Sequence, residues 1–225
     1  MNKADLESAT RQINAALLLL RNAIKQYRSA SDWAPPRFML EKPAKKIPES
    51  ALTETRVFSD RNALLASLPE GGRIAEVGTQ HGNWAFEILQ QKQPEELHLF
   101  DITFNLLRED VRKSPAIALH KGDSSSSLSG IEDGYFDWIY IDGDHSYQGV
   151  QRDIQEAVKK VKAGGLLVFN DYTQWSPMEA IPYGVPAAVN ELLCSGWNMK
   201  AIALTHTGYW DVALQKGTHS PDLPK

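Results

Sequence analysis

The chain contains a single cysteine, Cys194, among its 225 residues, so it cannot form an intramolecular disulfide. No histidine or further cysteine lies beside it at the spacing of a zinc site. Long apolar runs are also lacking: the run at residues 15–20 has six residues, whereas a membrane-spanning helix needs roughly 20. The first residues include Asp5 and Glu7 and lack the cleavage site of a signal peptide. We therefore expect a cytoplasmic protein without a membrane partner.

The sequence also lacks a strong excess of charge of either sign. Its formal net charge at pH 7 is -4, which gives no electrostatic reason to expect nucleic acid or an anionic membrane as the main partner. With 42% hydrophobic and 23% charged residues, the composition is that of an ordinary globular protein, long enough for one domain plus an accessory segment. A small molecule or a protein is therefore the expected substrate.

The first 50 residues are predicted to extend from the main domain. Apolar residues recur near a 3.6-residue period over residues 4–28, which predicts one amphipathic helix: Leu6, Ile13, Leu17, Leu20 and Ile24. Residues 31–48 contain four prolines and predict an irregular connection. The helix could pack on the domain, join two subunits of a homo-oligomer or help to close the site. We expect this extension at 1–50, the main domain at 51–217 and a tail at 218–225.

The remaining sequence alternates short apolar runs with amphipathic stretches, which is typical of an α/β sheet with crossover helices. Strands are predicted at residues 73–77, 97–100, 116–120, 138–141 and 166–169. Helices are predicted at 60–68, with Ser59 as N-cap, and at 83–91, 104–113, 124–128, 146–162 and 185–194. Two further strands, 199–204 and 209–214, should pair as an antiparallel hairpin. These elements predict a Rossmann-like, doubly wound, mostly parallel sheet with an antiparallel C-terminal hairpin.

Polar residues follow every predicted parallel strand, and ligands of such sheets bind where the strands end. The first strand leads into a glycine turn with G-x-x-x-G spacing, formed by Glu76, Gly78, Thr79, Gln80, Gly82 and Asn83. This is not the G-x-G-x-x-G pattern that wraps a dinucleotide pyrophosphate, so a ligand without phosphate fits better. S-adenosylmethionine is such a ligand, and Glu76 could accept a hydrogen bond from its ammonium group. A turn without a ligand is the alternative, and His81 within it is as readily an exposed loop residue.

Two acids at later strand ends extend this set. Asp101, followed by Ile102, ends the second strand, where a carboxylate can accept hydrogen bonds from both ribose hydroxyls. Asp123, followed by Ser124, comes after the third strand, where it could accept a hydrogen bond from the adenine amino group. Each aspartate is also a good helix N-cap, which is the competing structural role. Because Asp101 and Asp123 follow the glycine turn at successive strand ends, the three features together predict a site for an adenosine without a pyrophosphate.

Two longer segments carry a family resemblance. They are F-D-W-I-Y-I-D-G-D-H-S-Y-Q-G-V-Q-R-D-I at residues 136–154 and G-G-L-L-V-F-N-D-Y at residues 164–172. With the glycine turn, Asp101 and Asp123, they resemble class I S-adenosylmethionine-dependent methyltransferases. More narrowly, they resemble small-molecule O-methyltransferases of the macrocin and novobiocin-pathway type and cephalosporin-hydroxylase-like proteins. The resemblance covers roughly residues 55–215 and implies a seven-stranded sheet and methyl transfer to a hydroxyl of a small-molecule acceptor.

The same resemblance implies a divalent-metal site. Members of that branch often hold a cation at positions that correspond here to Asp142, Asn170 and Asp171. Oxygen donors suit Mg²⁺ rather than zinc, but Asn170 replaces one of two acids, so metal dependence stays open. Asp142 would also contact the cofactor and take part in catalysis. Candidates for the base that removes the hydroxyl proton are Asp144 and His145, whose alternative roles are to cap the next helix and to stabilise the fold.

Two other functional classes stay open. A metal-dependent hydrolase could use residues 142–145 as metal ligands, with further ligands drawn from His206, Asp211, His219 and Asp222. A non-catalytic binding protein of the same fold is the second alternative. In the methyltransferase interpretation, Trp175, Met178, Tyr183 and Trp210 are expected to form an apolar substrate wall, and Tyr172 is expected to pack near the metal site. Packing in the core or at a hinge is the alternative for at least half of these residues.

Overall fold

The computed structural model describes residues 3–30 and 39–217, and the chain divides into two compact units, Met1–Leu40 and Glu41–Lys225. In the first unit, α1 (Lys3–Ser29) confirms the predicted N-terminal helix, and none of its residues is buried. The division falls ten residues before the boundary predicted at residue 50. Residues 31–38 of the predicted connection and the predicted tail lie outside the described residues, so the domain limits stay predictions. No helix within the described ranges is long and apolar enough to cross a membrane.

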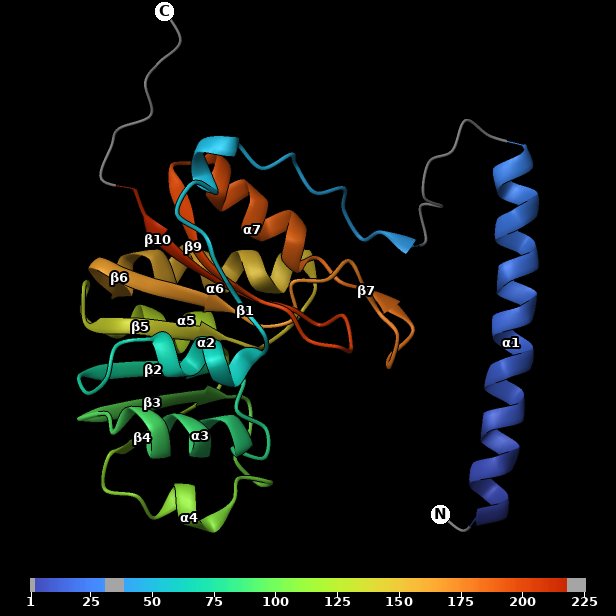
Figure 1. The fold of residues 1–225 in the computed structure, drawn as a ribbon. Coiled ribbons are helices and arrows are strands. Elements are labelled where there is room, and N and C mark those ends of the chain that lie inside the picture. The colour runs from blue at the N-terminus through green and yellow to red at the C-terminus, as the bar shows by residue number, and fades with distance from the viewer. Residues whose placement is uncertain (1–2, 31–38, 218–225) are drawn as a thin grey trace, which may run out of the picture. The chain divides into compact units, whose positions relative to one another are not determined.

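The second unit is built on an eight-stranded sheet with the strand order β1-β9-β10-β6-β5-β2-β3-β4 (Figure 1). The strands are β1 (Arg56–Phe58), β2 (Arg73–Val77), β3 (Glu96–Asp101), β4 (Ile117–Lys121), β5 (Phe136–Ile141), β6 (Val161–Phe169), β9 (Trp197–Ala203) and β10 (Asp211–Lys216). Neighbours pair in parallel, except that β10 is antiparallel to both β9 and β6. This arrangement confirms the predicted Rossmann-like α/β fold with its C-terminal hairpin. The strand order reverses between β2 and β5, where such sheets bind ligands.

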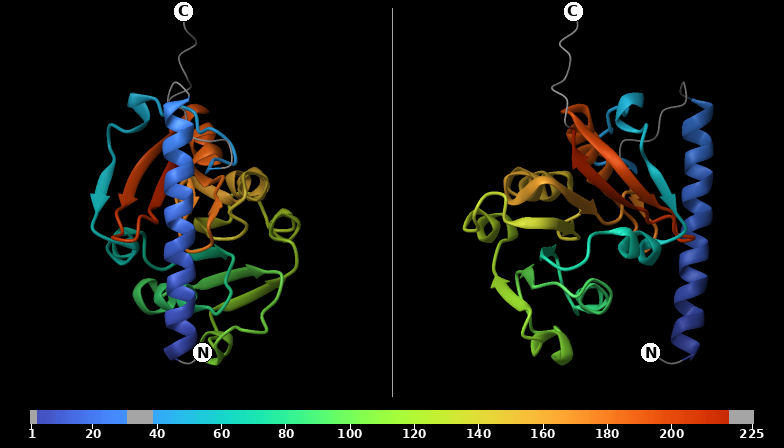
Figure 2. Two further views of the ribbon diagram at one scale, coloured as in Figure 1. Left: turned by 90° about the vertical axis from the view of Figure 1, so that its right-hand side faces the viewer. Right: turned by 60° about the vertical axis from the view of Figure 1, so that its left-hand side comes forward.

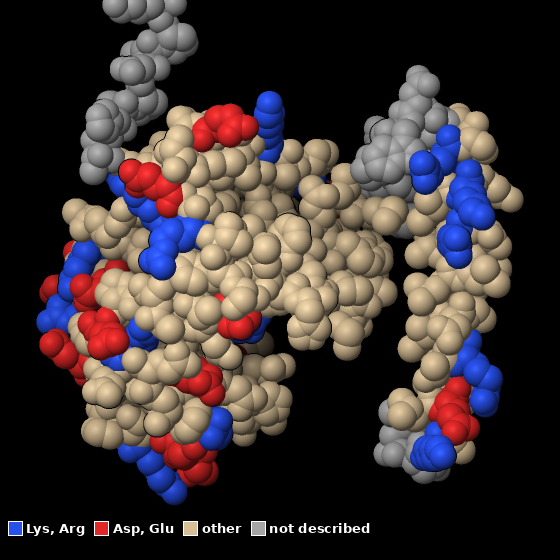
Figure 3. Space-filling view, in the orientation of Figure 1, with Lys and Arg blue, Asp and Glu red and all other residues tan. Residues whose placement is uncertain are grey.

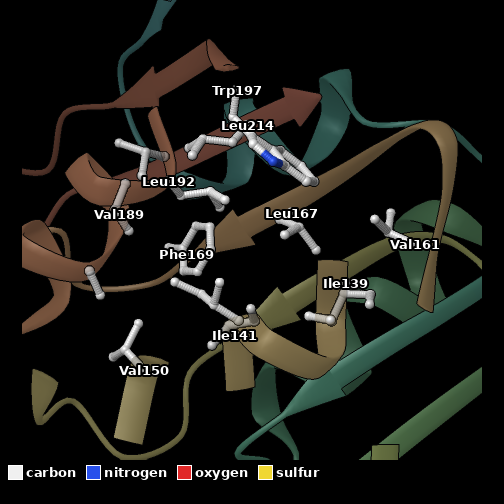
Figure 4. Packing of buried hydrophobic residues seen from close by; sticks show 14 of the residues in the cluster. Ile139, Ile141, Val150, Val161, Leu167, Phe169, Val189, Leu192, Trp197 and Leu214 are labelled. Carbon is white, nitrogen blue, oxygen red and sulfur yellow. The ribbon is translucent and has the colours of Figure 1, made fainter. Parts of the chain in front are cut away.

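Helices cover both faces of this sheet (Figures 1 and 2). One face packs on α5 (Ser124–Ser129), α6 (Tyr147–Lys160) and α7 (Val185–Cys194), and the other packs on α2 (Arg61–Ser67), α3 (Asn83–Lys92) and α4 (Glu109–Arg112). A short 3-10 helix, η2 (Glu49–Ala51), precedes β1, and a small hairpin of β7 (Trp175–Ser176) and β8 (Ile181–Pro182) follows β6. Since both faces are covered, the central strands are apolar along nearly their whole length. Figure 4 shows Ile139 and Ile141 of β5 beside Leu167 and Phe169 of β6 in one of the two core layers.

The sheet has eight strands rather than the seven that the family resemblance implied. The additional strand, β1, pairs in parallel with β9, so that Val57 lies opposite Ile202 at the edge of the sheet. It has only three residues, and its first two side chains are exposed. Such a short edge strand has no apolar alternation that would predict it from sequence, because it is stabilised by backbone pairing.

Two helix predictions require correction. The helix predicted at 104–113 is reduced to α4, because the backbone nitrogen of Arg108 donates to the backbone oxygen of His81 at 3.1 Å instead of continuing a helix. At α2, the N-cap is Asp60 and not Ser59, since Asp60 Oδ1 accepts from the backbone nitrogen of Ala63 at 2.8 Å. Both differences depend on the hydrogen-bond partners of backbone N–H groups, which the folded structure decides.

Candidate active site

A cavity of about 1120 Å³ opens where the parallel strands β2 to β6 end. It is lined by all three predicted catalytic residues and by every predicted cofactor residue except Gly82, whereas Asn170 of the predicted metal site is not in its wall. Nine acidic residues line it against three arginines: Glu76, Glu87, Asp101, Asp123, Asp142, Asp144, Asp153, Asp171 and Glu179 against Arg61, Arg108 and Arg152. This excess of negative charge favours a ligand that carries positive charge.

The turn between β2 and α3 requires both of its glycines. Gly78 has a φ of +84°, and a Cβ atom there would lie 2.0 Å from the backbone oxygen of Asp142. Gly82 has a φ of +74° and is the N-cap of α3, and a Cβ there would meet Leu107 at 2.4 Å. The glycines therefore allow the turn to pack directly on the backbone of Asp142 and on the side chain of Leu107.

The side chain of Asp101 holds this turn in place. Its Oδ2 accepts hydrogen bonds from the backbone nitrogens of Thr79 at 2.9 Å and Gln80 at 2.8 Å. Its Oδ1 accepts from the backbone nitrogen of Thr103 at 3.0 Å. A carboxylate can accept about four hydrogen bonds, so the structural role of Asp101 leaves capacity for a ligand. Its contact with ribose hydroxyls stays a prediction.

Glu76 is a buried acid with an unsatisfied oxygen. It lies on β2, directly before the glycine turn, and is 1% exposed. Its Oε2 has no hydrogen-bond partner, and neither has Oγ1 of Thr79, which is also buried. Burial raises the pKa of Glu76 well above its usual range, and the nearby charge of Asp142 raises it further. A hydrogen-bond donor that entered the cavity would offset the free-energy cost of burying this oxygen without a partner.

The end of β4 supplies Asp123 and Ser124. Asp123 is the N-cap of α5, and its Oδ1 accepts from the backbone nitrogen of Ser126 at 2.9 Å. Ser124 Oγ donates to Asp153 Oδ1 at 2.5 Å. Asp153 was not predicted as a site residue; it is 3% exposed, and burial raises its pKa to about 6. Because Asp123 and Ser124 both line the cavity, capping does not prevent the predicted contact with adenine, which stays a prediction.

Asn170 lies between the carboxylates of Asp142 and Asp171. With its amide nitrogen toward Tyr140 Oη at 3.0 Å, its amide oxygen would face only those two carboxylates. In the reverse orientation, the nitrogen donates to Asp142 Oδ1 at 2.8 Å and Asp171 Oδ1 at 3.0 Å, and the oxygen accepts from Arg61 Nη2 at 2.6 Å. We adopt the reverse orientation, because a guanidinium is only a donor and must face the oxygen. Asn170 therefore places N–H groups between the two acids.

Arg61 completes this cluster, and no sequence pattern predicted it. Its Nη2 lies 3.6 Å from Asp171 Oδ1 and 3.4 Å from Asp211 Oδ1. Asp211 is fully buried and accepts a hydrogen bond from Tyr140 Oη at 2.6 Å, which ties it to the fold. Arg61 begins an ordinary amphipathic helix, and Asp211 starts a strand 40 residues after Asp171, so no local pattern brings these residues together.

His145 lines the cavity and has a buried nitrogen without a hydrogen-bond partner. Its Nε2 lies 3.4 Å from Asp142 Oδ1 and 4.0 Å from Asp171 Oδ2, and it has no hydrogen-bond partner of good geometry. The imidazole stacks on the ring of Tyr183, with 4.6 Å between the centroids. Burial lowers the pKa of His145, but the nearby carboxylates, above all Asp142, outweigh this effect and raise it. The structure thus places an imidazole base, held by stacking on Tyr183, beside the carboxylate of Asp142 at the carboxyl end of β5.

Asp144 has structural partners. Its Oδ1 accepts from the backbone nitrogen of Ser146 at 2.9 Å, and its Oδ2 lies 3.7 Å from Arg152 Nη2. The N-cap of α6 is Ser146 itself, whose hydroxyl accepts from the backbone nitrogen of Gly149. Asp144 therefore stabilises the turn before α6, and its side chain is exposed.

A second cavity of about 290 Å³ shares Arg61, Asp171, Glu179 and Tyr183 with the first. Its other lining residues are Ser176, Met178, Thr207 and Tyr209. Of the predicted apolar wall, Tyr183 and Met178 therefore reach these cavities. Neither cavity is lined by Trp175 or Trp210. Tyr172, predicted to pack near the metal site, lines neither cavity, and its hydroxyl donates to Asn190 Oδ1 at 2.5 Å.

Comparison with known sequences gives one family match and one curated relative. Residues 75–172 match the sequence model of a family described as a methyltransferase domain, and this segment contains the glycine turn and most of the cavity wall. An uncharacterized protein of Acanthamoeba polyphaga mimivirus is 42% identical over 59 residues, which are 25% of this chain and 24% of that protein. The match thus spans about a quarter of the relative's length.

Solved structures of methyltransferases share the fold. TrmK of M. capricolum, in complex with S-adenosylhomocysteine, has a TM-score of 0.54 and 15% identity, over 76% of this chain and 74% of TrmK. An O-methyltransferase family protein of Burkholderia thailandensis has a TM-score of 0.52 and 12% identity, over 72% of this chain and 56% of that protein. At such low identity, the likeness establishes the fold. The chain therefore combines a methyltransferase-like fold with a methyltransferase-domain sequence match at the cavity.

Proposed function

We propose that this protein is an S-adenosylmethionine-dependent methyltransferase that methylates a hydroxyl group of a small molecule. The observation that carries the proposal is the unpartnered Oε2 of Glu76 in an acidic cavity at the strand ends. A cationic donor would satisfy it, and S-adenosylmethionine has both an ammonium and a sulfonium charge. The family match at residues 75–172 and the S-adenosylhomocysteine bound to TrmK support the same ligand class.

Three acids at successive strand ends would hold the cofactor. Glu76 would accept hydrogen bonds from its ammonium group, Asp101 from its ribose hydroxyls and Asp123 from its adenine amino group. When bound, the cofactor supplies a methyl group on a sulfonium, which is a good leaving group. The remaining residues need only to position an acceptor oxygen and to remove one proton.

We assign proton removal to His145. His145 lines the cavity, its buried Nε2 has no hydrogen-bond partner, and Asp142 Oδ1, 3.4 Å from that nitrogen, would stabilise the imidazolium that forms. Stacking on Tyr183 restrains the ring, and Tyr183 also lines the smaller cavity, which is suited to the acceptor. Asp144, the other candidate base, is engaged by Ser146 and Arg152 and is therefore less suited to the role.

The divalent cation implied by the family resemblance does not fit the side chains as they are arranged. Among the described residues, no group of three or more His, Cys, Asp or Glu side chains is placed to hold a metal ion. Between Asp142 and Asp171, the amide N–H groups of Asn170 stand where a cation would stand. Arg61, 3.6 Å from Asp171, supplies positive charge. No step of the proposed reaction therefore passes through a metal.

Asn170→Asp tests this conclusion. The substitution removes the N–H donors and adds a third carboxylate beside Asp142 and Asp171, so it should create a site for Mg²⁺ or Mn²⁺ that the wild type lacks. Electron paramagnetic resonance of added Mn²⁺ measures binding without turnover. We expect the signal of free Mn²⁺ to fall with the variant and to stay unchanged with the wild type. Equal binding by the two proteins would contradict the assignment.

Titration calorimetry with S-adenosylmethionine and S-adenosylhomocysteine tests the proposed function. We expect both to bind, and the absence of binding of either at millimolar concentration would end the proposal. Methyl transfer to a panel of hydroxylated small molecules, followed by mass spectrometry, then tests catalysis. Binding without turnover on such a panel would favour the non-catalytic alternative. A cytoplasmic location and the absence of a nucleic-acid partner stay predictions.

A further inference from the structure

The helix α1 carries an apolar seam, with large apolar side chains that are exposed along its length. It has 27 residues, none of which is buried. Large apolar side chains on it are more than half exposed, among them Leu6 at 53%, Ile13 at 59% and Leu17 at 57%. An isolated helix of this kind gains most of its stability by burying an apolar face against another element.

The spacing of the seam identifies the kind of element that would cover it. Its residues recur at alternating intervals of four and three: Leu6, Thr10, Ile13, Leu17, Leu20, Ile24 and Tyr27. This alternation of four and three averages 3.5 residues per repeat and is the pattern of a coiled-coil seam, which packs against a second helix along its full length. Along one side of the seam, alanines recur every seven residues, at Ala9, Ala16 and Ala23, and their small size allows two helices to approach closely.

We propose that α1 pairs with α1 of a second copy of this chain as an antiparallel coiled coil. The seam is self-complementary in this direction, since Leu6 would lie near Ile24 of the second copy, and Ile13 near Leu17. The direction follows from charge. Residues 17–29 contain three basic residues and no acid, whereas in residues 3–16 the acids Asp5 and Glu7 balance the bases Lys3 and Arg11. Figure 3 shows basic side chains toward both ends of the helix and acidic ones only toward its start. A parallel pair would place the two basic halves side by side, and an antiparallel pair places each basic half beside the half of the other copy that has no net charge and contains both acids.

Two leucines provide a matched pair of variants. Leu17 lies on the seam, and Leu19 lies off it, yet both are exposed, at 57% and 71%. Sedimentation equilibrium of the full chain should give twice the chain mass of 25.1 kDa for the wild type and for Leu19→Glu, and the single mass for Leu17→Glu. Circular dichroism and binding of S-adenosylhomocysteine check that the variants are folded. A monomeric wild type, or equal loss of the dimer in the two variants, would overturn the proposal.

Disulfide cross-linking tests the direction of the pair. Cys194 is the only cysteine and is exposed, so the substitutions are made in a Cys194→Ser background. In the antiparallel register, Ala16 lies next to Ala16 of the second copy, so Ala16→Cys should cross-link efficiently with itself. Leu20→Cys should not, because the two copies of residue 20 lie about ten residues apart along the axis, or roughly 15 Å. Cross-linking of Leu20→Cys without that of Ala16→Cys would show a parallel pair and overturn the assignment.

Discussion

At the scale of single residues, Glu76 is the most sensitive test of the cofactor site. Its carboxyl is buried and its Oε2 has no partner, so the ammonium group of a bound cofactor would be its main source of compensation. A hydrogen bond to a charged group contributes about 1.5–3 kcal/mol, so Glu76→Gln should weaken binding of S-adenosylhomocysteine about tenfold or more. Titration calorimetry measures this change.

Glu87→Gln is the matched control for that substitution. Glu87 also lines the cavity, but its Oε2 already accepts a hydrogen bond from Gln91 Nε2 at 3.1 Å. We expect its affinity for S-adenosylhomocysteine to stay near that of the wild type. The melting temperature of Glu76→Gln should not fall, because the variant no longer buries an ionisable carboxyl. Equal loss of binding in the two variants would contradict the role assigned to Glu76.

Asp153 should make the stability of the fold depend on pH. Burial raises its pKa to about 6 in the folded protein, against an ordinary value of 3.8. Between these values the folded state binds more protons than the unfolded state, so the free energy of unfolding falls as the pH rises from 4 to 6. Asp153→Asn can still accept from Ser124 and should be more stable at pH 7.5 by up to about 3 kcal/mol.

Urea unfolding of the wild type and of Asp153→Asn over a pH series measures this difference. The stabilisation should be nearly constant above pH 6 and should shrink toward zero below pH 4, where the wild-type carboxyl is protonated in both states. A difference that did not change with pH would show that the variant acts by packing and not by removal of a buried charge.

At the scale of elements, the turn between β2 and α3 depends on backbone space. Gly78→Ala would force a Cβ to within 2.0 Å of the backbone oxygen of Asp142 and would strain a φ of +84°. Gly71→Ala strains a similar φ of +66° but meets no atom within 4 Å. Gly71→Ala should lower the free energy of unfolding by about 1–2 kcal/mol, and Gly78→Ala should lower it clearly more. Urea unfolding compares them, and equal losses would show that strain alone matters at Gly78.

Sequence patterns predicted the elements whose own residues form a regular apolar pattern. The central strands are apolar because both faces are covered, and α6 has one apolar stripe, so both were predicted from residue type. The strand β1 and the shortened α4 were not predicted, because backbone pairing with β9 and the hydrogen bond from Arg108 to His81 decide them. These interactions join segments that are far apart in the chain.

At the scale of the whole molecule, hydrogen exchange should show which backbone amides of the two units are protected when the cofactor binds. A ligand that binds the cavity should protect the backbone amides of residues 76–83 and the ends of β3, β4 and β5. The exchange of residues 3–29 should not change, because the proposed pair of α1 helices is independent of the cavity. Mass spectrometry with and without S-adenosylhomocysteine measures both regions. Protection of α1 on ligand binding would instead support its alternative role in closing the site.

The sequence by itself determined the order of elements, the apolar core and the acids at the strand ends, because each follows from residue type and local spacing. The tertiary structure decided which of those acids are free to act. It tied Asp144 to the start of α6, used Asp101 to hold the glycine turn and left Glu76 without a partner. It also brought Arg61 and Asp211 to the cluster around Asn170. Such contacts join residues up to 150 positions apart, and no periodic pattern in a sequence records them.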